Sequence, residues 1–465
     1  MPLAIQEEEL MVATSEPQDI AALGDLQAAT RKKIRPTLAI KAHIDQTINR
    51  YYKLTDSICA QIASATEAAI RVGPGDPNAT AVVQIVQLVI AQAVREWASD
   101  VYFEPRDGEV QVRFRVNGQL RDSIKLPGPL QAPLVRRIKV MSKIDSGEAR
   151  QLQEGRFSMK VGETQTEVRV TIVTTDKGDL VALRLLDDAN TILPLKQLGF
   201  WPAALEAYTK VLDRPFGLVL ISGPSGSGKT TTLFASLQHF TERNRDVVTV
   251  EEPVEYRLPT IKQIQVNDHG TTAADAINNA LRLSPDVLLV SDIREASTAR
   301  AVLRAASTGH LVLSCIEAND TVSALFRFKD LDVDLRLLAP DLTGCVYQRL
   351  VRRICPYCRQ AYQPSPEEMA AFRRITSQDT GEFYKGVGCN FCDQSGYMGL
   401  AGLFEVLPVS NDIKTLLSKG ASYGEIREQA IKEGMVTIQQ DGMLKAAQGT
   451  TTIAEFMRVI PFLES

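Results

Sequence analysis

The chain has 465 residues, with 52 Lys or Arg against 56 Asp or Glu, a net charge of −4 and a pI near 5.8. This length exceeds what one hydrophobic core serves, so we expect about two to four domains, and the slightly acidic balance argues against a nucleic-acid-binding protein. No segment has the ~20 uninterrupted apolar residues of a membrane span, and the acidic start is unlike a signal peptide, which together predict a cytoplasmic protein.

The N-terminal region shows little pattern. Residues 1–36 are mixed and acidic with weak periodicity, which predicts a flexible arm or a small partial subdomain. The segment Ile40–Tyr52 has the spacing of an amphipathic helix, and the run Val72–Asn78 is dense in glycine and proline, as in a linker. We therefore assign residues 1–78 to an N-terminal arm and a partial helical region.

An α+β unit is predicted next. From Val82 to Trp97, apolar residues recur at three- and four-residue steps, so one face of a helix there should be buried. From Val110 to Asn117, apolar and polar residues alternate as in a half-buried strand, and Asn117-Gly118 favours a hairpin turn. The further elements expected are a helix at Leu134–Met141 and strands at Glu167–Thr174 and Leu180–Leu186.

The strongest motif of the chain is a complete G-x-x-x-x-G-K-T phosphate loop. A strand-like apolar run precedes it and a helix-like segment follows, which is the order that such a loop requires. Backbone N–H groups and the helix N-terminus would bind phosphates, with Lys229 reaching the β- and γ-phosphates and Thr230 holding Mg²⁺. The predicted ATP-binding residues are Gly223, Pro224, Ser225, Gly226, Ser227, Gly228, Lys229, Thr230 and Thr231.

Around this loop, residues 217–349 alternate short apolar strands with helices, which predicts a parallel sheet with helices on both faces. The strands are expected at Leu218–Ile221, Val247–Val250, Val287–Val290 and His310–Cys315.

Carboxylates follow two of these predicted strands. The strand ending at Val290 leads to Asp292, the pattern of a Walker B strand whose acid holds Mg²⁺ or orients a water. The strand ending at Val250 leads to Glu251 and Glu252, and a Glu here could polarise the attacking water. A solvated acidic loop explains this second pair equally well.

Two other kinds of side chain could reach the phosphates. His310 opens a strand that we expect to face the phosphate site, where its imidazole is either functional or structural. Arginines are numerous in the α+β unit, and in oligomeric P-loop machines a neighbouring subunit or domain supplies cations to the γ-phosphate. The candidate cations are Arg137, Arg150 and Arg156, together with Arg169 and Arg184, although a solvated basic face explains any one of them equally well.

Four of the seven cysteines form two C-x-x-C pairs, Cys355 with Cys358 and Cys389 with Cys392. Four thiolates in two such knuckles satisfy tetrahedral Zn²⁺ and leave no open position, so the zinc would be structural. A redox pair or a chance spacing is the alternative. The intervening segment Gln360–Gly388 is expected to fold as a small helical excursion.

Taken together, these motifs resemble those of the type II secretion and type IV pilus assembly ATPases, a family of hexameric secretion-motor NTPases. The resemblance covers most of the chain, from about residue 79 to 459, and implies a RecA-like ATPase domain preceded by an N2-type domain. It also implies a hexamer and a Zn²⁺ ion bound by the four cysteines. The partners that it implies are an inner-membrane platform protein and a cytoplasmic tether. The motifs that carry it are Ala98–Pro105, Val112–Gly118, Arg137–Met141, Glu154–Arg156, the phosphate loop, Glu251–Glu255, Ser284–Val290, Thr308–Val312, Gln348–Arg353, the four cysteines and Gly396-Tyr397.

The chain departs from that family at several hydrolysis positions. Walker B ends in Ser291-Asp292 where the family has Gly-Glu, and Glu317 stands where the family has a second His. Retraction of the carboxylate at position 292 by about 1 Å can cost on the order of 10²-fold in rate, and a carboxylate at 317 near the γ-phosphate would oppose ATP. Slow turnover is therefore expected. The other departures are Glu252, Tyr102, Met398 and Leu400.

We thus expect an α/β protein in which water, oriented by Glu251 with Asp292 assisting at Mg²⁺, attacks the γ-phosphate of ATP held by Lys229. The alternative is a nucleotide-binding pseudoenzyme or regulatory subunit that mixes with an active paralogue. A DNA-translocating motor is disfavoured by the acidic balance and the four-cysteine insert, and pilus retraction ATPases, as the family is known, lack that insert. The predicted domains after residue 78 are an N2-type α+β domain (79–187), a P-loop ATPase core (188–350), a four-cysteine metal-binding insertion (351–402) and a helical C-terminal domain (403–465).

Overall fold

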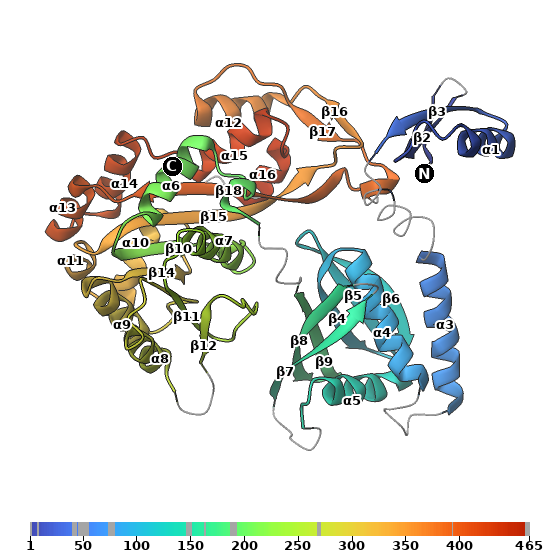
Figure 1. The fold of residues 1–465 in the computed structure, drawn as a ribbon, viewed down its shortest axis with the longest axis horizontal. Helices are drawn as coiled ribbons and strands as arrows, with labels where there is room; N and C mark the ends of the chain where they lie inside the picture. Colours follow the sequence, from blue (N-terminus) through green and yellow to red (C-terminus); the bar gives the residue numbers. More distant parts are fainter. Residues whose placement is uncertain are drawn as a thin grey trace. The chain divides into compact units, whose positions relative to one another are not determined.

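Figure 1 shows the computed structural model of the chain, which describes residues 2–6, 9–39, 44, 55–72, 80–145, 151–161, 164–186, 193–266, 271–392 and 394–460. The chain divides into two compact units, Met1–Asp188 and Ala189–Ser465. None of the described helices combines the length and the apolar character that crossing a lipid bilayer requires.

The N-terminal unit begins with a small three-stranded sheet. Its strands are β1 (Pro2–Gln6), β2 (Glu9–Thr14) and β3 (Lys33–Leu38), with β1 antiparallel and β3 parallel to β2, and α1 (Ile20–Thr30) connects β2 to β3. Of the two alternatives predicted for residues 1–36, a flexible arm or a small partial subdomain, the described residues fit the second. The weak sequence pattern has a physical reason, since none of the eleven residues of α1, all of which are described, is buried.

Two predictions near this sheet fall mostly outside the described residues. Of the helix predicted at Ile40–Tyr52 only Ile44 is described, and it is helical and buried. The linker predicted at Val72–Asn78 is not described beyond Val72, where helix α3 (Thr55–Val72) ends.

The rest of the N-terminal unit is an antiparallel six-stranded sheet with helices packed against it. The sheet order is β6-β5-β4-β9-β8-β7, and α4 packs on α3, on α5 and on β4. The α+β prediction is therefore confirmed, although β4, β6 and β7 were not predicted. The elements are α4 (Thr80–Arg95), α5 (Gln131–Met141), β4 (Ala98–Arg106), β5 (Glu109–Val116), β6 (Gln119–Pro127), β7 (Leu152–Val161), β8 (Thr164–Thr175) and β9 (Gly178–Leu186).

The predicted patterns in this unit largely hold. The apolar residues of β5 that alternate from Val110 to Val116 are all buried, and Asn117 and Gly118 turn the chain with φ values of 50° and 78°. Trp97 is an exception to the predicted buried helix face. It follows the end of α4 at a φ of 57° and is 58% exposed, because the chain leaves the helix before reaching it.

The C-terminal unit is built on a seven-stranded sheet of order β12-β11-β13-β14-β10-β15-β18. Neighbouring strands are parallel throughout except for β15 and β18, so the parallel sheet predicted for residues 217–349 is confirmed, and β18, which the sequence did not predict, adds an antiparallel edge to it. The strands are β10 (Gly217–Ser222), β11 (Val247–Glu251), β12 (Lys262–Gln265), β13 (Val287–Val290), β14 (Leu311–Ile316), β15 (Leu342–Ile354) and β18 (Tyr397–Pro408).

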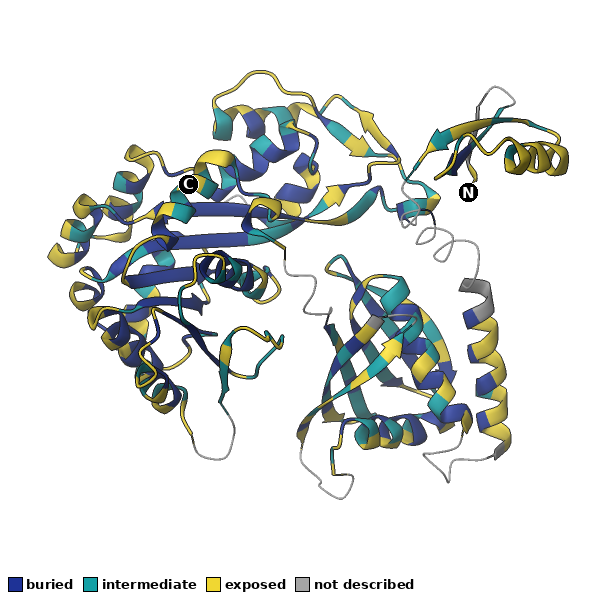
Figure 2. Cartoon of the chain, viewed as in Figure 1, coloured by how far each residue is buried: buried dark blue, intermediate teal, exposed yellow. Residues whose placement is uncertain are grey.

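Both faces of this sheet are covered, as the sequence predicted. Leu218 and Leu220 of β10 belong to one hydrophobic cluster, whereas Val219 and Ile221 belong to another, because successive side chains point to opposite faces. Figure 2 shows the resulting buried strands between layers of helix. The helices of this part are α6 (Pro202–Leu212), α7 (Lys229–Thr241), α8 (Ala273–Leu281), α9 (Ala296–Ser307), α10 (Thr321–Asp330) and α11 (Leu335–Leu338).

Strands β15 and β18 form a long ribbon that carries the cysteine segment at its end. The predicted helical excursion between the cysteine pairs is present as α12 (Pro366–Thr376), beside the short pair β16 (Arg359–Ala361) and β17 (Tyr384–Gly386). The ribbon extends into residues that the sequence assigned to the insertion and to the helical domain, and arginines interrupt the apolar pattern of β15. The chain ends with α13 (Asn411–Lys419), α14 (Tyr423–Lys432), α15 (Ile438–Ala447) and α16 (Ile453–Val459).

Buried carboxylates tie these C-terminal helices to the ribbon. Glu405 of β18 accepts hydrogen bonds from the backbone N–H of Thr321 (3.0 Å) and of Ile438 (3.2 Å), at the starts of α10 and α15. Glu455 of α16 pairs with Arg352 of β15 at 2.7 Å. Because each carboxylate is fully buried and satisfied, the C-terminal helices are held to the same sheet that carries the phosphate loop.

Candidate functional site

The phosphate loop lies between β10, whose six residues are all buried, and the start of α7. Gly226 and Gly228 have φ values of 74° and 87°, which favour glycine. At Gly223 (φ 149°), a Cβ atom would lie 2.5 Å from the carbonyl oxygen of Gln348 and from Ser227 Oγ. A side chain at any of these three glycines would therefore strain the backbone or clash with neighbouring atoms.

Lys229 is held at the loop itself. Its Nζ donates to the carbonyl oxygens of Gly223 (2.8 Å) and Pro224 (3.0 Å). Ser225, Gly226 and Thr231 are exposed, and Thr230 is half-buried at the first turn of α7. The ammonium, the helix N-terminus and the loop amides thus gather in one place, as anion binding requires.

Gln348 opens one of the motifs behind the family resemblance but was not predicted as a site residue, although it touches the loop from β15. Its Nε2 donates to the carbonyl oxygen of Ser227 (2.8 Å), and its Oε1 accepts from Thr232 Oγ1 (2.7 Å). The available signal was a glutamine within that motif, but its partners lie more than a hundred positions away along the chain.

The loop shares its edge of the sheet with Asp292 and Glu317. The strands β13, β14 and β10 are neighbours and parallel, so the residues after them meet at one edge. Asp292 Oδ2 accepts from Arg294 Nε at 3.0 Å, while its Oδ1 is buried and has no hydrogen-bond partner among the described residues. The hydrogen bond from Arg294 to Asp292 raises the pKa of the guanidinium, with smaller contributions from Glu252 and Glu317.

The two glutamates after β11 differ in their surroundings. Glu251 is 2% exposed, and its carboxylate accepts from Thr249 Oγ1 (2.6 Å) and Gln263 Nε2 (2.9 Å). Burial raises the pKa of this carboxyl. Glu252 is exposed, and its backbone N–H donates to Ser291 Oγ (3.3 Å) in the Walker B segment. The carboxylate accessible to solvent is therefore that of Glu252, whereas that of Glu251 is enclosed by Thr249 and Gln263.

The expectation that His310 faces the phosphate site is wrong. His310 precedes β14, and its carbonyl oxygen accepts from the backbone N–H of Gly217 at the start of β10, whereas the loop follows the end of β10. Its Nδ1 lies 3.2 Å from the carbonyl oxygen of Ala305. His310 thus lies at the opposite edge of the sheet, where its ring makes local contacts.

The candidate arginines belong to the N-terminal unit. Arg137 is half-buried on α5, Arg156 is exposed on β7 and lies 3.9 Å from Glu167, and Arg150 is outside the described residues. Arg156, Arg169 and Arg184 stand directly opposite one another on β7, β8 and β9, so they form a row across one face of the sheet.

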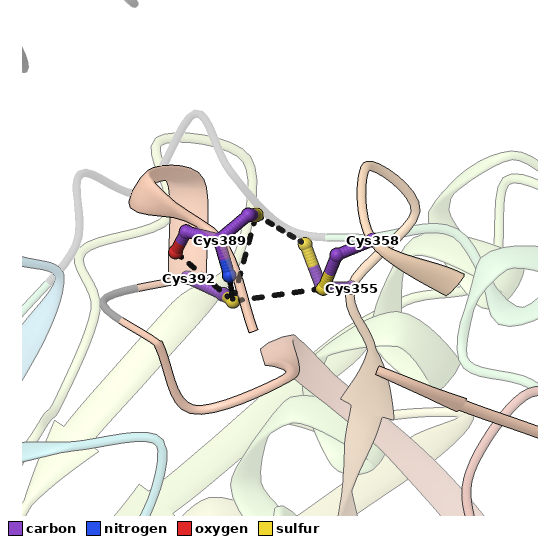
Figure 3. A group of neighbouring side chains, drawn as sticks. All are labelled: Cys355, Cys358, Cys389 and Cys392. Atoms are coloured by element: carbon purple, nitrogen blue, oxygen red, sulfur yellow. Dashed lines mark hydrogen bonds between the residues drawn. The ribbon is translucent and has the colours of Figure 1, made fainter. Parts of the chain in front are cut away.

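The four cysteines converge as the sequence predicted (Figure 3). All four Sγ atoms lie within 4.8 Å of one another, with 3.8 Å between Cys355 and Cys389, 3.8 Å between Cys358 and Cys392, and 3.7 Å between Cys389 and Cys392. A tetrahedral Zn²⁺ with Zn–S bonds of about 2.3 Å requires sulfur separations of about 3.8 Å, whereas a disulfide requires about 2.05 Å. The donor set therefore fits Zn²⁺.

Backbone groups support the same interpretation. The N–H groups of Cys389 (3.3 Å) and Gly396 (3.2 Å) donate to Cys392 Sγ. Although burial acts in the opposite direction, these bonds lower the pKa of the Cys392 thiol, whereas burial raises the pKa of Cys355 and of Cys358. Metal binding at this cluster would therefore release protons.

Comparisons with known proteins agree with this architecture. The family model described as "Type II/IV secretion system protein" matches residues 76–458, and the MshEN domain model matches residues 1–58. The type IV pilus assembly ATPase PilB of Thermus thermophilus is 34% identical over 98% of this chain, and the type II secretion system protein HxcR of Pseudomonas aeruginosa is 39% identical over 81%. The chain spans 52% of the first relative's length and 77% of the second's.

Among solved structures, the fold resembles the ATPase DotB of Legionella pneumophila, with 18% identity, a TM-score of 0.60 and coverage of 80% of this chain and 94% of that one. It also resembles the pilus retraction motor PilT with bound ADP, with 22% identity, a TM-score of 0.57 and coverage of 81% and 97%. At these identities the likeness concerns the fold alone.

Proposed function

Because the chain belongs to the type II/IV secretion system protein family, as its motifs had suggested, we propose that it is an ATP-driven motor that assembles a type II secretion pseudopilus or a type IV pilus-like fibre. The observation that carries the proposal is the complete phosphate loop, with Lys229 held on it, at the same sheet edge as Asp292. Its relatives are described as a pilus assembly ATPase and type II secretion proteins.

In this proposal the loop amides and Lys229 bind the phosphates, and Thr230 with Asp292 would hold Mg²⁺. Oδ1 of Asp292, which is buried and has no hydrogen-bond partner in the described parts of the chain, supports the fit, because a cation would satisfy it. Mg²⁺ would neutralise charge that develops on the phosphates. Glu252, the exposed carboxylate of the edge, would orient the attacking water, and Glu251 would fix the end of β11 through Thr249 and Gln263.

Further proposals concern the oligomer, its partners and its metal. We propose a homo-hexamer in which Arg137, Arg150 or Arg156 of a neighbouring subunit supplies positive charge to the γ-phosphate. The motor would act at the inner membrane as a peripheral protein, through a platform protein and a cytoplasmic tether. The four cysteines would hold a structural Zn²⁺, since the cluster is closed by four thiol ligands.

One observation favours a second candidate, a nucleotide-binding subunit with slow or no hydrolysis. Glu252, Asp292 and Glu317 place three carboxylates around one guanidinium, that of Arg294. Like charges at this edge would oppose the γ-phosphate, and such a chain could work in a mixed assembly with an active paralogue.

The two candidates are separated by phosphate release with Mg-ATP, measured together with nucleotide binding, for the wild type and Lys229→Ala. Turnover that the Lys229 change abolishes supports the motor. Tight binding without turnover, alone and with membranes, supports the regulatory subunit. Absence of binding in the wild type would overturn both.

A further inference from the structure

The amide of Gln348 is buried beneath the phosphate loop. Gln348 follows Tyr347, which pairs with Ser222 at the end of β10, so β15 brings it level with Gly223. Its side chain is 2% exposed, and Nε2 would lie 3.2 Å from a Cβ atom at Gly228. A buried polar group in a strand of this kind needs partners, and here they all belong to the loop and its helix.

Both the nitrogen and the oxygen of the Gln348 side-chain amide form hydrogen bonds, and the two partners determine which atom is which. The carbonyl oxygen of Ser227 can only accept, so it receives the N–H of Gln348. The hydroxyl of Thr232, in the first turn of α7, donates to the amide oxygen. Gln348 thus connects the loop to the helix that follows it.

This contact determines which way one loop amide points. A trans peptide is planar, with its C=O and N–H directed to opposite sides. Since Gln348 holds the carbonyl of Ser227 inward, the N–H of Gly228 in the same peptide is directed away from Gln348. That direction is the one required of an N–H donor to a bound phosphate.

We propose that Gln348 is a positioning residue for phosphate binding, which acts by holding the peptide between Ser227 and Gly228 in the orientation that turns the Gly228 N–H toward the ligand. This inference rests on the proposed nucleotide binding and deepens it. It assigns to β15, which the sequence did not predict as a strand of this sheet, a direct part in nucleotide affinity.

The test measures dissociation constants of fluorescent ATP and ADP and of adenosine, for the wild type, Gln348→Met, Thr232→Val, the double variant and Thr232→Ser. We expect Gln348→Met to weaken ATP and ADP about tenfold, the effect of one lost buried hydrogen bond, with adenosine unchanged. Thr232→Val should weaken ATP severalfold, Thr232→Ser should bind as the wild type does, and the double variant should be no weaker than Gln348→Met.

Gln111→Met is the matched control, because Gln111 is also a buried strand glutamine, but its Nε2 donates to carbonyls of β5 and β6 in the N-terminal unit. It should leave ATP affinity unchanged. Unchanged ATP affinity in Gln348→Met, or equal weakening of adenosine, would overturn the inference. Should that variant not fold, unchanged ATP affinity in Thr232→Val, or an equal loss of affinity in Thr232→Ser, would do so. Failure of the wild type to bind ATP would instead remove the proposed function.

Discussion

The two ends of strand β14 place two candidate residues in opposite environments. His310 precedes the strand, and Glu317 follows it, so the two are about 23 Å apart at roughly 3.3 Å per residue. At the amino end, His310 makes contacts with its own turn. At the carboxyl end, Glu317 lies near Arg294, with Asp292 and the phosphate loop along the same edge.

This difference shows that the direction of a strand decides which of its ends can act on a ligand. In open sheets with parallel strands, ligands bind outside the carboxyl ends, where loops and helix N-termini converge. A residue that opens such a strand is therefore separated from the site by the whole sheet, even when it lies within a few positions of a motif.

The largest effect is expected from variants at the two ends of β13. Asp292→Asn should lower ATP turnover by at least about 100-fold, because the site loses the charge that would hold Mg²⁺. Asp286→Asn is the matched control at the amino end, where Asp286 accepts from the backbone N–H of Asp246 (2.8 Å), and should leave turnover within about twofold. Steady-state phosphate release measures both, and equal losses in the two variants would contradict the division between edges.

The next prediction concerns a variant that should hydrolyse ATP faster than the wild type. Asp292→Glu should raise turnover by about tenfold, since the longer side chain advances the carboxylate by about 1 Å, a distance to which catalytic groups are sensitive. The turnover number at saturating Mg-ATP is the measurement. An unchanged or lower turnover would show that Asp292 is not what limits hydrolysis.

A smaller change is expected at the carboxyl end of β14. Glu317→His should tighten ATP binding about three- to tenfold at low salt, because it removes a negative charge beside Arg294 and the proposed γ-phosphate position. Glu317→Gln distinguishes the loss of charge from the gain of an imidazole. Isothermal titration at two salt concentrations gives the affinities, and an effect of equal size in high salt would argue against electrostatic repulsion.

The smallest effect is expected at the amino end. His310→Ala should change neither ATP affinity nor turnover by more than about twofold, and should cost about 1 kcal/mol of unfolding free energy through its lost local hydrogen bond. Thermal unfolding and phosphate release on the same preparation measure the two quantities. A tenfold loss of turnover without a loss of stability would overturn the placement of His310.

The sequence allowed the central strands to be predicted because β10, β11, β13 and β14 are short apolar runs buried on both faces. The strands β12 and β15 escaped prediction, since β12 is a polar edge strand and β15 carries charged residues such as Arg349 and Arg352. The phosphate loop and the cysteine cluster were predictable because spacing within a motif fixes their geometry.

Other parts of the site depend on contacts between distant segments. The bonds of Gln348 to Ser227 and Thr232 join positions that are 121 and 116 residues apart, and no local pattern marks such a pair. The enclosure of Glu251 depends on Gln263 of the unpredicted β12. For His310 the motif was visible, but its distance from the loop followed only from the strand order and direction.

The ribbon of β15 and β18 joins two sites that could carry spectroscopic probes, the phosphate loop and the cysteine cluster. Cys355, at the thiol cluster, comes seven positions after Gln348, under the phosphate loop, which is about 23 Å at roughly 3.3 Å per residue. Tetrahedral cobalt(II) in sulfur ligands absorbs visible light, so loading the four cysteines with cobalt would place an energy acceptor at the other end of the ribbon from a fluorescent nucleotide bound at the loop. Quenching in that pair would report bending of the ribbon during a nucleotide cycle, with no label attached to the protein.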